Sequence, residues 1–125
     1  GNEYCHVRFD ILQKKTITFV NLEVSEEIYQ KLAEAGLDKI VNYSEYTFCD
    51  EAETFTIEAV KLDFDSRDKI LRLLTNELIN DLLRFFDLFK NPTVKEMRQN
   101  LKYVKILVKM YLYIKNEEIT FFSYE

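Results

Sequence analysis

Glycine, proline and histidine are scarce in this chain, and tryptophan is absent. Among 125 residues there are two glycines, one proline and one histidine. A loop that cradles phosphate needs several glycines close together, whereas the glycines here stand at positions 1 and 36. Scarce glycine and proline also favour regular elements with short connections. The composition therefore excludes a glycine-rich phosphate loop and predicts a chain built of helices and strands.

The two cysteines and the single histidine offer little metal or redox chemistry. Cys5 and Cys49 fall in predicted strands, and their spacing fits neither a disulfide framework nor a zinc site. We interpret them as reduced core thiols, which favours a cytoplasmic protein. His6 is expected to point outward from its strand, and no nucleophile or orienting carboxylate is identified at a matching spacing. We therefore predict no metal, no cofactor and no catalytic residue.

Long hydrophobic runs are also missing, although apolar residues are plentiful. Hydrophobic residues make up 47% of the chain, enough for the core of one domain over residues 1–125. No run of about 18 apolar residues occurs, so we expect no membrane partner. The net charge is −5: residues 1–60 hold 12 acidic and 5 basic side chains, and residues 61–125 hold 10 and 12. The acidic half disfavours nucleic acid as a partner.

Alternating apolar and polar residues predict two β-hairpins in the first half of the chain. The four strands are expected over residues 4–12, 16–24, 43–49 and 54–62. Between the hairpins, Ser25 and Gly36 bracket a short helix over residues 25–35. In the fourth strand the apolar residues change face near Ala59, so we predict a β-bulge there.

Two long amphipathic helices are predicted next, over residues 66–90 and 93–110. Ser66 is the expected cap of the first helix, and the lone proline separates the two. Thr93 and Glu96 have the spacing of a capping box for the second. The apolar face of the second helix, which we expect to be buried, follows a 3-4 spacing through Val94, Met97, Leu101, Val104, Val108 and Tyr111.

The end of the second long helix has a competing interpretation. Residues 104–115 also alternate as a strand would, but only helical spacing gathers the basic residues of this segment on one side. We therefore favour helix to about residue 110 and predict a last hairpin from residues 113–115 and 119–124. The order predicts an α+β fold, in which an antiparallel sheet of about 4–6 strands packs against two long helices and one short helix.

Two charged surfaces are the candidate binding sites. An acidic connection between strands would attract a basic protein partner, through Asp50, Glu51, Glu53 and Glu58. A basic stripe on the second long helix would contact phosphates, through Lys95, Arg98, Lys102, Lys105 and Lys109. Asp63 and Asp65 precede the first long helix, but the glycine of a calcium loop is missing and we assign them to capping.

The absence of catalytic motifs predicts a non-enzymatic cytoplasmic module that binds another protein, such as a small acidic inhibitor or immunity-type protein. One alternative is a nucleic-acid-binding accessory protein that uses the basic stripe. Another is a small-ligand or enzyme domain with a pocket between sheet and helices, using Asp63 and Asp65. The wide apolar stripes also predict a homodimer that forms through the long helices.

Overall fold

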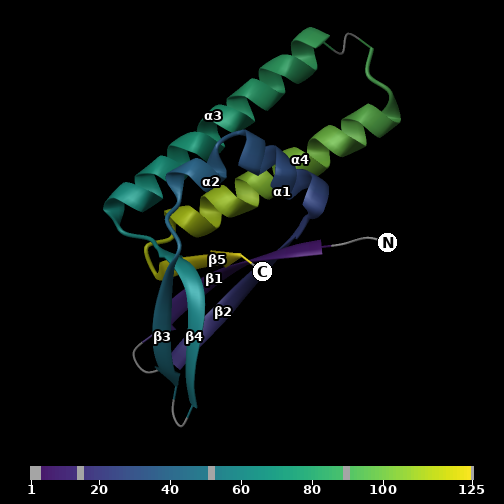
Figure 1. Ribbon diagram of the computed structural model, residues 1–125. Helices are drawn as coiled ribbons and strands as arrows, with labels where there is room; N and C mark the ends of the chain where they lie inside the picture. The colour runs from purple at the N-terminus through teal and green to yellow at the C-terminus, as the bar shows by residue number, and fades with distance from the viewer. Residues whose placement is uncertain (1–3, 14–15, 51–52, 89–90, 125) are drawn as a thin grey trace.

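The computed structural model describes residues 4–13, 16–50, 53–88 and 91–124, with side chains over 20–48, 54–87 and 91–124. The elements in chain order are β1 (Tyr4–Gln13), β2 (Thr16–Ser25), α1 (Glu26–Glu34), α2 (Leu37–Ile40), β3 (Ser44–Asp50), β4 (Glu53–Lys61), α3 (Phe64–Leu88), α4 (Val94–Lys115) and β5 (Ile119–Tyr124). The strands pair antiparallel in the order β2-β1-β5-β4-β3, and the helices lie at one end of this sheet (Figure 1). The predicted α+β class is confirmed.

The last strand, β5, joins the two predicted hairpins into one sheet. It pairs with β1 over five residue pairs, but with β4 only at Val60↔Phe122 and Lys61↔Phe121. Both hairpins extend past β5 on the side away from the helices (Figure 1). The sheet is therefore continuous close to the helices and divides into two separate hairpins farther away.

The predicted hairpin at the end of the chain is wrong, because residues 113–115 belong to α4. Ile114 is fully buried and continues the core-facing row of this helix, which also holds Tyr103, Leu107 and Met110. Packing of that row against the core thus extends the helix five residues beyond the predicted end at residue 110. Alternation of apolar residues in this segment reflects two apolar helix faces and not a strand.

The β-bulge predicted near Ala59 is also wrong, because β3 and β4 pair without a register shift from Ser44↔Ala59 onward. Both faces of β4 are covered instead. Ala59 packs with Phe48 and Phe121 on the face away from the helices, whereas Val60 belongs to the helix-side core. Adjacent apolar residues in this strand therefore serve two different cores.

A register shift is present, but it lies between β1 and β5. Asp10 pairs with Phe121 and Ile11 pairs with Ile119, so Thr120 is an extra residue in β5. Such an extra residue moves the side chains that follow it to the other face of a sheet. As a result Ile119 and Phe122 both point into the helix-side core, three residues apart.

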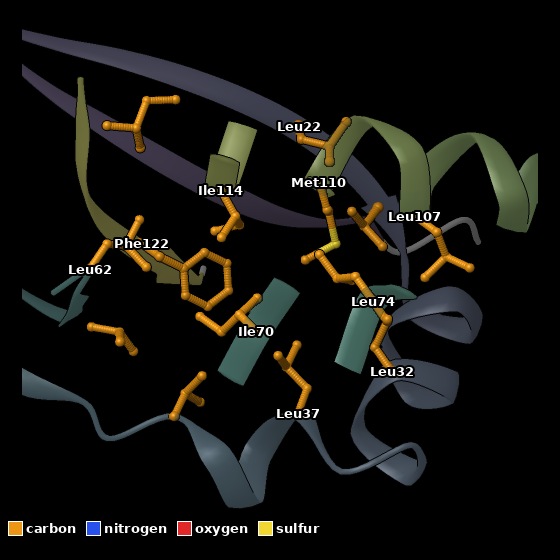
Figure 2. Close-up of a cluster of buried hydrophobic side chains, with 14 of the residues drawn as sticks. Leu22, Leu32, Leu37, Leu62, Ile70, Leu74, Leu107, Met110, Ile114 and Phe122 are labelled. Atoms are coloured by element: carbon orange, nitrogen blue, oxygen red, sulfur yellow. The ribbon is translucent and has the colours of Figure 1, made fainter. Parts of the chain in front are cut away.

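The main core lies between the sheet and the helices (Figure 2). Its buried side chains include Leu22 of β2, Leu32 of α1, Leu37 of α2, Leu62 between β4 and α3, Ile70 and Leu74 of α3, Leu107, Met110 and Ile114 of α4, and Phe122 of β5. Complete burial of one such side chain stabilises a fold by roughly 1.5–3 kcal/mol. This core fixes the first half of α3 and the second half of α4.

Local capping explains where the long helices begin. The side chain of Asp63 accepts a hydrogen bond of 2.8 Å from the backbone N–H of Ser66, and α3 begins at Phe64. The cap predicted at Ser66 is therefore wrong by one turn. In contrast, the predicted cap of α4 is confirmed, because the Thr93 hydroxyl accepts a bond of 3.1 Å from the Glu96 N–H.

The short helix is bracketed as the sequence predicts. Ser25 caps α1 by accepting a hydrogen bond of 3.3 Å from the backbone N–H of Ile28. Gly36 has a φ of +110°, a conformation that favours glycine, and it lies just before α2. The chain therefore turns at Gly36 and places Leu37 in the core.

Candidate functional site

The carboxylates near the start of α3 are engaged in holding that helix. Hydrogen bonds from Ser66 to the Asp63 carboxylate lower the pKa of this acid. Asp65 forms an ion pair of 3.0 Å with Lys69, and Asp68 forms one of 2.8 Å with Arg72. Over the part of the chain that the structure describes, no three His, Cys, Asp or Glu side chains gather where they would hold a metal ion.

The predicted acidic site is only partly visible in the structure. Glu51 and the side chains of Asp50 and Glu53 lie outside the described residues. Glu58 is exposed on β4 and stands directly opposite Glu45 of β3, which is also exposed. Like charges directly opposite each other on neighbouring strands destabilise a sheet. The β3–β4 hairpin thus carries negative charge at a cost in stability.

The predicted basic stripe lies on one side of α4, and all five side chains are exposed. Their positions within the helix span less than a third of its circumference. Three of them, Lys102, Lys105 and Lys109, line a groove, whereas Lys95 and Arg98 lie beyond its end. The structure therefore divides the stripe into a groove part and an outer part.

The groove runs between α4 on one side and β2 with the start of α1 on the other, and its volume is about 990 Å³. The β2–α1 side carries three exposed glutamates, Glu23, Glu26 and Glu27, and one lysine, Lys31, whose ammonium lies over the Tyr103 ring. Apolar side chains that line the groove between the two charged sides include Leu22, Ile28 and Ile106. The basic residues of the groove therefore face acidic ones, which weakens the attraction for a polyanion such as nucleic acid.

A second surface is apolar and covers the α3–α4 hairpin. We define the helix-hairpin face as eight large apolar side chains that are 38–74% exposed. They are Ile79, Leu82 and Phe86 of α3 and Val94, Met97, Leu101, Val108 and Leu112 of α4. Neither α3 after Leu74 nor α4 before Tyr103 has a buried side chain among the residues with described side chains. The far ends of both helices project beyond the sheet, α1 and α2 (Figure 1).

The two rows of this face lie on the same side of the helix pair. In each helix the core-facing row and the exposed row are separated by roughly two-fifths of a turn. Partly buried side chains lie between the two rows, Leu71 and Leu78 on α3 and Val104 and Tyr111 on α4. Because α3 and α4 are antiparallel neighbours, both exposed rows are then directed away from the core.

The apolar row that we expected to be buried on α4 is instead largely exposed. The core contacts come from a second row with the same spacing, Tyr103, Leu107, Met110 and Ile114. Leu101 of the predicted row is 64% exposed and Val94 is 58% exposed. The prediction of a helix is confirmed, but the predicted buried face is wrong.

The size of the exposed apolar surface distinguishes it from ordinary surface. From the exposed fractions, the helix-hairpin face presents on the order of 800 Å², whereas the largest apolar patch of a typical monomer measures about 300–600 Å². The whole chain exposes 8674 Å², compared with about 7,000 Å² for a compact monomer of 15.0 kDa. The molecule therefore exposes about a fifth more surface than its mass requires.

No protein-family model matches this chain, and no curated protein or solved structure shows significant similarity to it. None of the helices within the described residues is both long and apolar enough to pass through a membrane.

Proposed function

We propose that this protein is a non-enzymatic, cytoplasmic protein-binding module whose binding surface is the helix-hairpin face. The observation that carries the proposal is the exposure of eight large apolar side chains on the projecting ends and outer side of α3 and α4. Covering on the order of 800 Å² per partner corresponds to a protein–protein interface of standard size. Burial of this area would supply the missing core of the hairpin ends.

A second copy of the chain is the partner that the surface fits. The exposed residues Val94, Met97, Leu101 and Val108, together with the partly buried Val104 and Tyr111, follow the 3-4 spacing of a coiled-coil seam along α4. A seam of this kind packs against another amphipathic helix, and α4 of a second copy presents the same seam. A two-fold arrangement would bring the two identical faces together and close the assembly at a dimer.

Light scattering tests this proposal directly. We expect the chain to have twice its own mass of 15.0 kDa at micromolar concentration. A Leu101→Glu, Phe86→Glu double variant should have the mass of one chain. Dimerisation would bury each new carboxylate against apolar side chains of the second copy, which is unfavourable. Far-ultraviolet circular dichroism of the variant should retain the helical signal.

The matched control is Asn76→Glu with Asn80→Glu, which adds the same two charges at exposed positions of α3 outside the helix-hairpin face. This variant should remain dimeric. A single-chain mass for the unchanged protein up to millimolar concentration would rule out the second copy. Equal dissociation by the control and the double variant would show that charge alone, and not the apolar face, controls association.

The β3–β4 hairpin is a second candidate surface, for a basic protein partner. Glu45 and Glu58 support it, because two exposed like charges are kept opposite each other where most sequences avoid them. An immunity-type role would use such a surface to speed association.

The test is the association rate of any basic protein retrieved from native lysate. That rate should fall with added salt and fall severalfold in a Glu45→Gln, Glu58→Gln variant, and an unchanged rate would exclude this surface.

A further inference from the structure

We propose that the groove between β2 and α4 binds an extended peptide segment of a partner protein, which adds to the sheet as a sixth strand beside β2. The segment carries acidic side chains toward α4 and basic side chains toward β2 and α1. This site is separate from the helix-hairpin face and does not depend on it.

The first observation is an open sheet edge. Within the residues that the structure describes, β2 pairs with β1 only, and no further backbone hydrogen bond reaches β2. The ladder between β1 and β2 is regular over ten pairs, with no shift. Natural edge strands are usually blocked by lysine, proline or a bulge. From Thr16 to Ser25 there is no lysine, proline or bulge, and Glu23 is the only charged residue.

The second observation is that the groove opens along this edge. Asn21, Leu22 and Glu23 all line it, although consecutive residues of a strand point to opposite faces of a sheet. Leu22 is buried in the core, whereas Asn21 and Glu23 are exposed, and β2 is the outermost strand, so the groove borders its open edge. From Asn21 to Ser25 β2 extends about 13 Å, and the α4 side from Gln99 to Tyr113 extends about 21 Å. The groove therefore has the length of five or six extended residues.

The third observation concerns the charges on the two sides. Lys102, Lys105 and Lys109 form no ion pair or hydrogen bond with any described side chain. The same holds for the glutamates across the groove, Glu23, Glu26 and Glu27. The groove thus separates a basic side from an acidic side that do not pair with each other.

An extended peptide is the ligand whose chemistry satisfies both sides at once. Its side chains alternate in direction, so that one set would point toward α4 and the other toward the outer face of β2. Acidic residues in the first set would pair with the lysines, and basic residues in the second set would pair with Glu23. Main-chain hydrogen bonds to β2 would supply affinity, and the alternating charges would set the register.

The probe is a fluorescent octapeptide. Its odd positions, whose side chains would point toward α4, are valine or glutamate, and its even positions, whose side chains would point toward the outer face of β2, are threonine or lysine. We expect saturable binding, measured by anisotropy, below about 1 mM. Two further peptides carry N-methyl groups on alternate amides, one set on each edge of the strand. Only one edge can pair with β2, so one methylated peptide should bind at least about tenfold more weakly and the other should bind nearly as well.

The protein variants separate the groove from general charge. A Lys102→Glu, Lys105→Glu variant should weaken binding at least about tenfold. The matched control, Lys95→Glu with Arg98→Glu, makes the same charge change on the same helix beyond the groove and should stay within about twofold. The proposal is overturned if the parent peptide does not bind, if both methylated peptides behave alike, or if both variants weaken binding equally. In the last case, retardation of a short single-stranded oligonucleotide would assign the stripe to nucleic acid.

Discussion

Arg67 holds together three elements that meet at one end of the sheet, beside the start of β5. Its guanidinium is partly buried and donates hydrogen bonds to four backbone carbonyl oxygens, those of Leu62, Ile114, Asn116 and Ile119. The last carbonyls of a helix lack N–H partners and carry partial negative charge. One cation therefore satisfies the end of α4 and ties it to the starts of α3 and β5. Burial lowers the pKa of Arg67, but an arginine remains charged at neutral pH.

Replacing Arg67 should destabilise the fold strongly. Arg67→Leu leaves four carbonyls without their donor, and we expect the free energy of unfolding to fall by about 3 kcal/mol. In Arg67→Lys the free energy of unfolding should fall by about 2 kcal/mol, because the four carbonyls are arranged around a planar guanidinium and a single ammonium cannot reach all of them. Urea unfolding measures both. The control Arg72→Leu, which removes only an exposed ion pair with Asp68, should change stability by less than about 1 kcal/mol. A fully stable lysine variant would show that the fork geometry is unimportant.

Three tyrosines make the fold sensitive to alkali. Burial is the largest cause that raises the pKa of Tyr29, of Tyr103 and, to about 12, of Tyr43. The Tyr103 hydroxyl also donates a hydrogen bond of 2.7 Å to Glu77. Because the folded pKa values exceed the unfolded value, these tyrosines contribute stability below about pH 10, and the contribution is lost as the pH rises toward the folded values.

We therefore expect the free energy of unfolding to decline above pH 10. Tyrosinate absorbance should show a late component from Tyr29, Tyr43 and Tyr103, together with loss of the circular dichroism signal. Tyr103→Phe should be less stable at pH 7 by about 1 kcal/mol, because it loses the bond to Glu77, and should show a shallower decline with alkali. If all tyrosines ionised near pH 10 in an intact fold, the three hydroxyls would not be shielded from water.

At the scale of elements, the sequence predicted which segments form helices and strands better than which faces they bury. Helix α4 has two apolar rows with the same 3-4 spacing, one through Leu101 and one through Leu107. Periodicity identifies both rows as apolar but does not say which row meets the sheet. That choice depends on contacts with distant residues such as Leu22 and Ile70. The adjacent lysine row was correctly predicted to share one side, because helical spacing alone determines it.

The strand pair β3–β4 offers a test of charge across the sheet. Glu58→Lys should raise the free energy of unfolding by roughly 0.5 kcal/mol, because an opposite charge would then face Glu45. Glu45→Lys should have a similar effect. The double variant restores a pair of like charges, so its stability should return to that of the unchanged protein. A double variant more stable than either single one would show that the two side chains do not interact and that net charge controls the effect.

At the scale of the whole molecule, the order of the strands could not be predicted. Both hairpins are local and were predicted, but β5 reaches between them from the end of the chain. Its pairing with β4 covers only two residues, and the extra residue Thr120 changes its face midway. Neither feature leaves a pattern in a short stretch of sequence. The groove likewise depends on where α4 crosses β2, so its lysines were predicted as a stripe and its edge was missed.

The projecting α3–α4 hairpin makes the stability of the molecule depend on chain concentration if two copies pair. Unfolding then separates a dimer, and each tenfold increase in concentration should stabilise it by about 1.4 kcal/mol. For a molecule of this size we expect the Tm to rise by about 3–5 °C per tenfold increase. In the Leu101→Glu, Phe86→Glu variant the Tm should not change with concentration. The Arg67→Lys variant should keep the dependence at a lower Tm, because Arg67 contacts the end of α4 at Ile114, far along the helices from the exchanged Leu101 and Phe86.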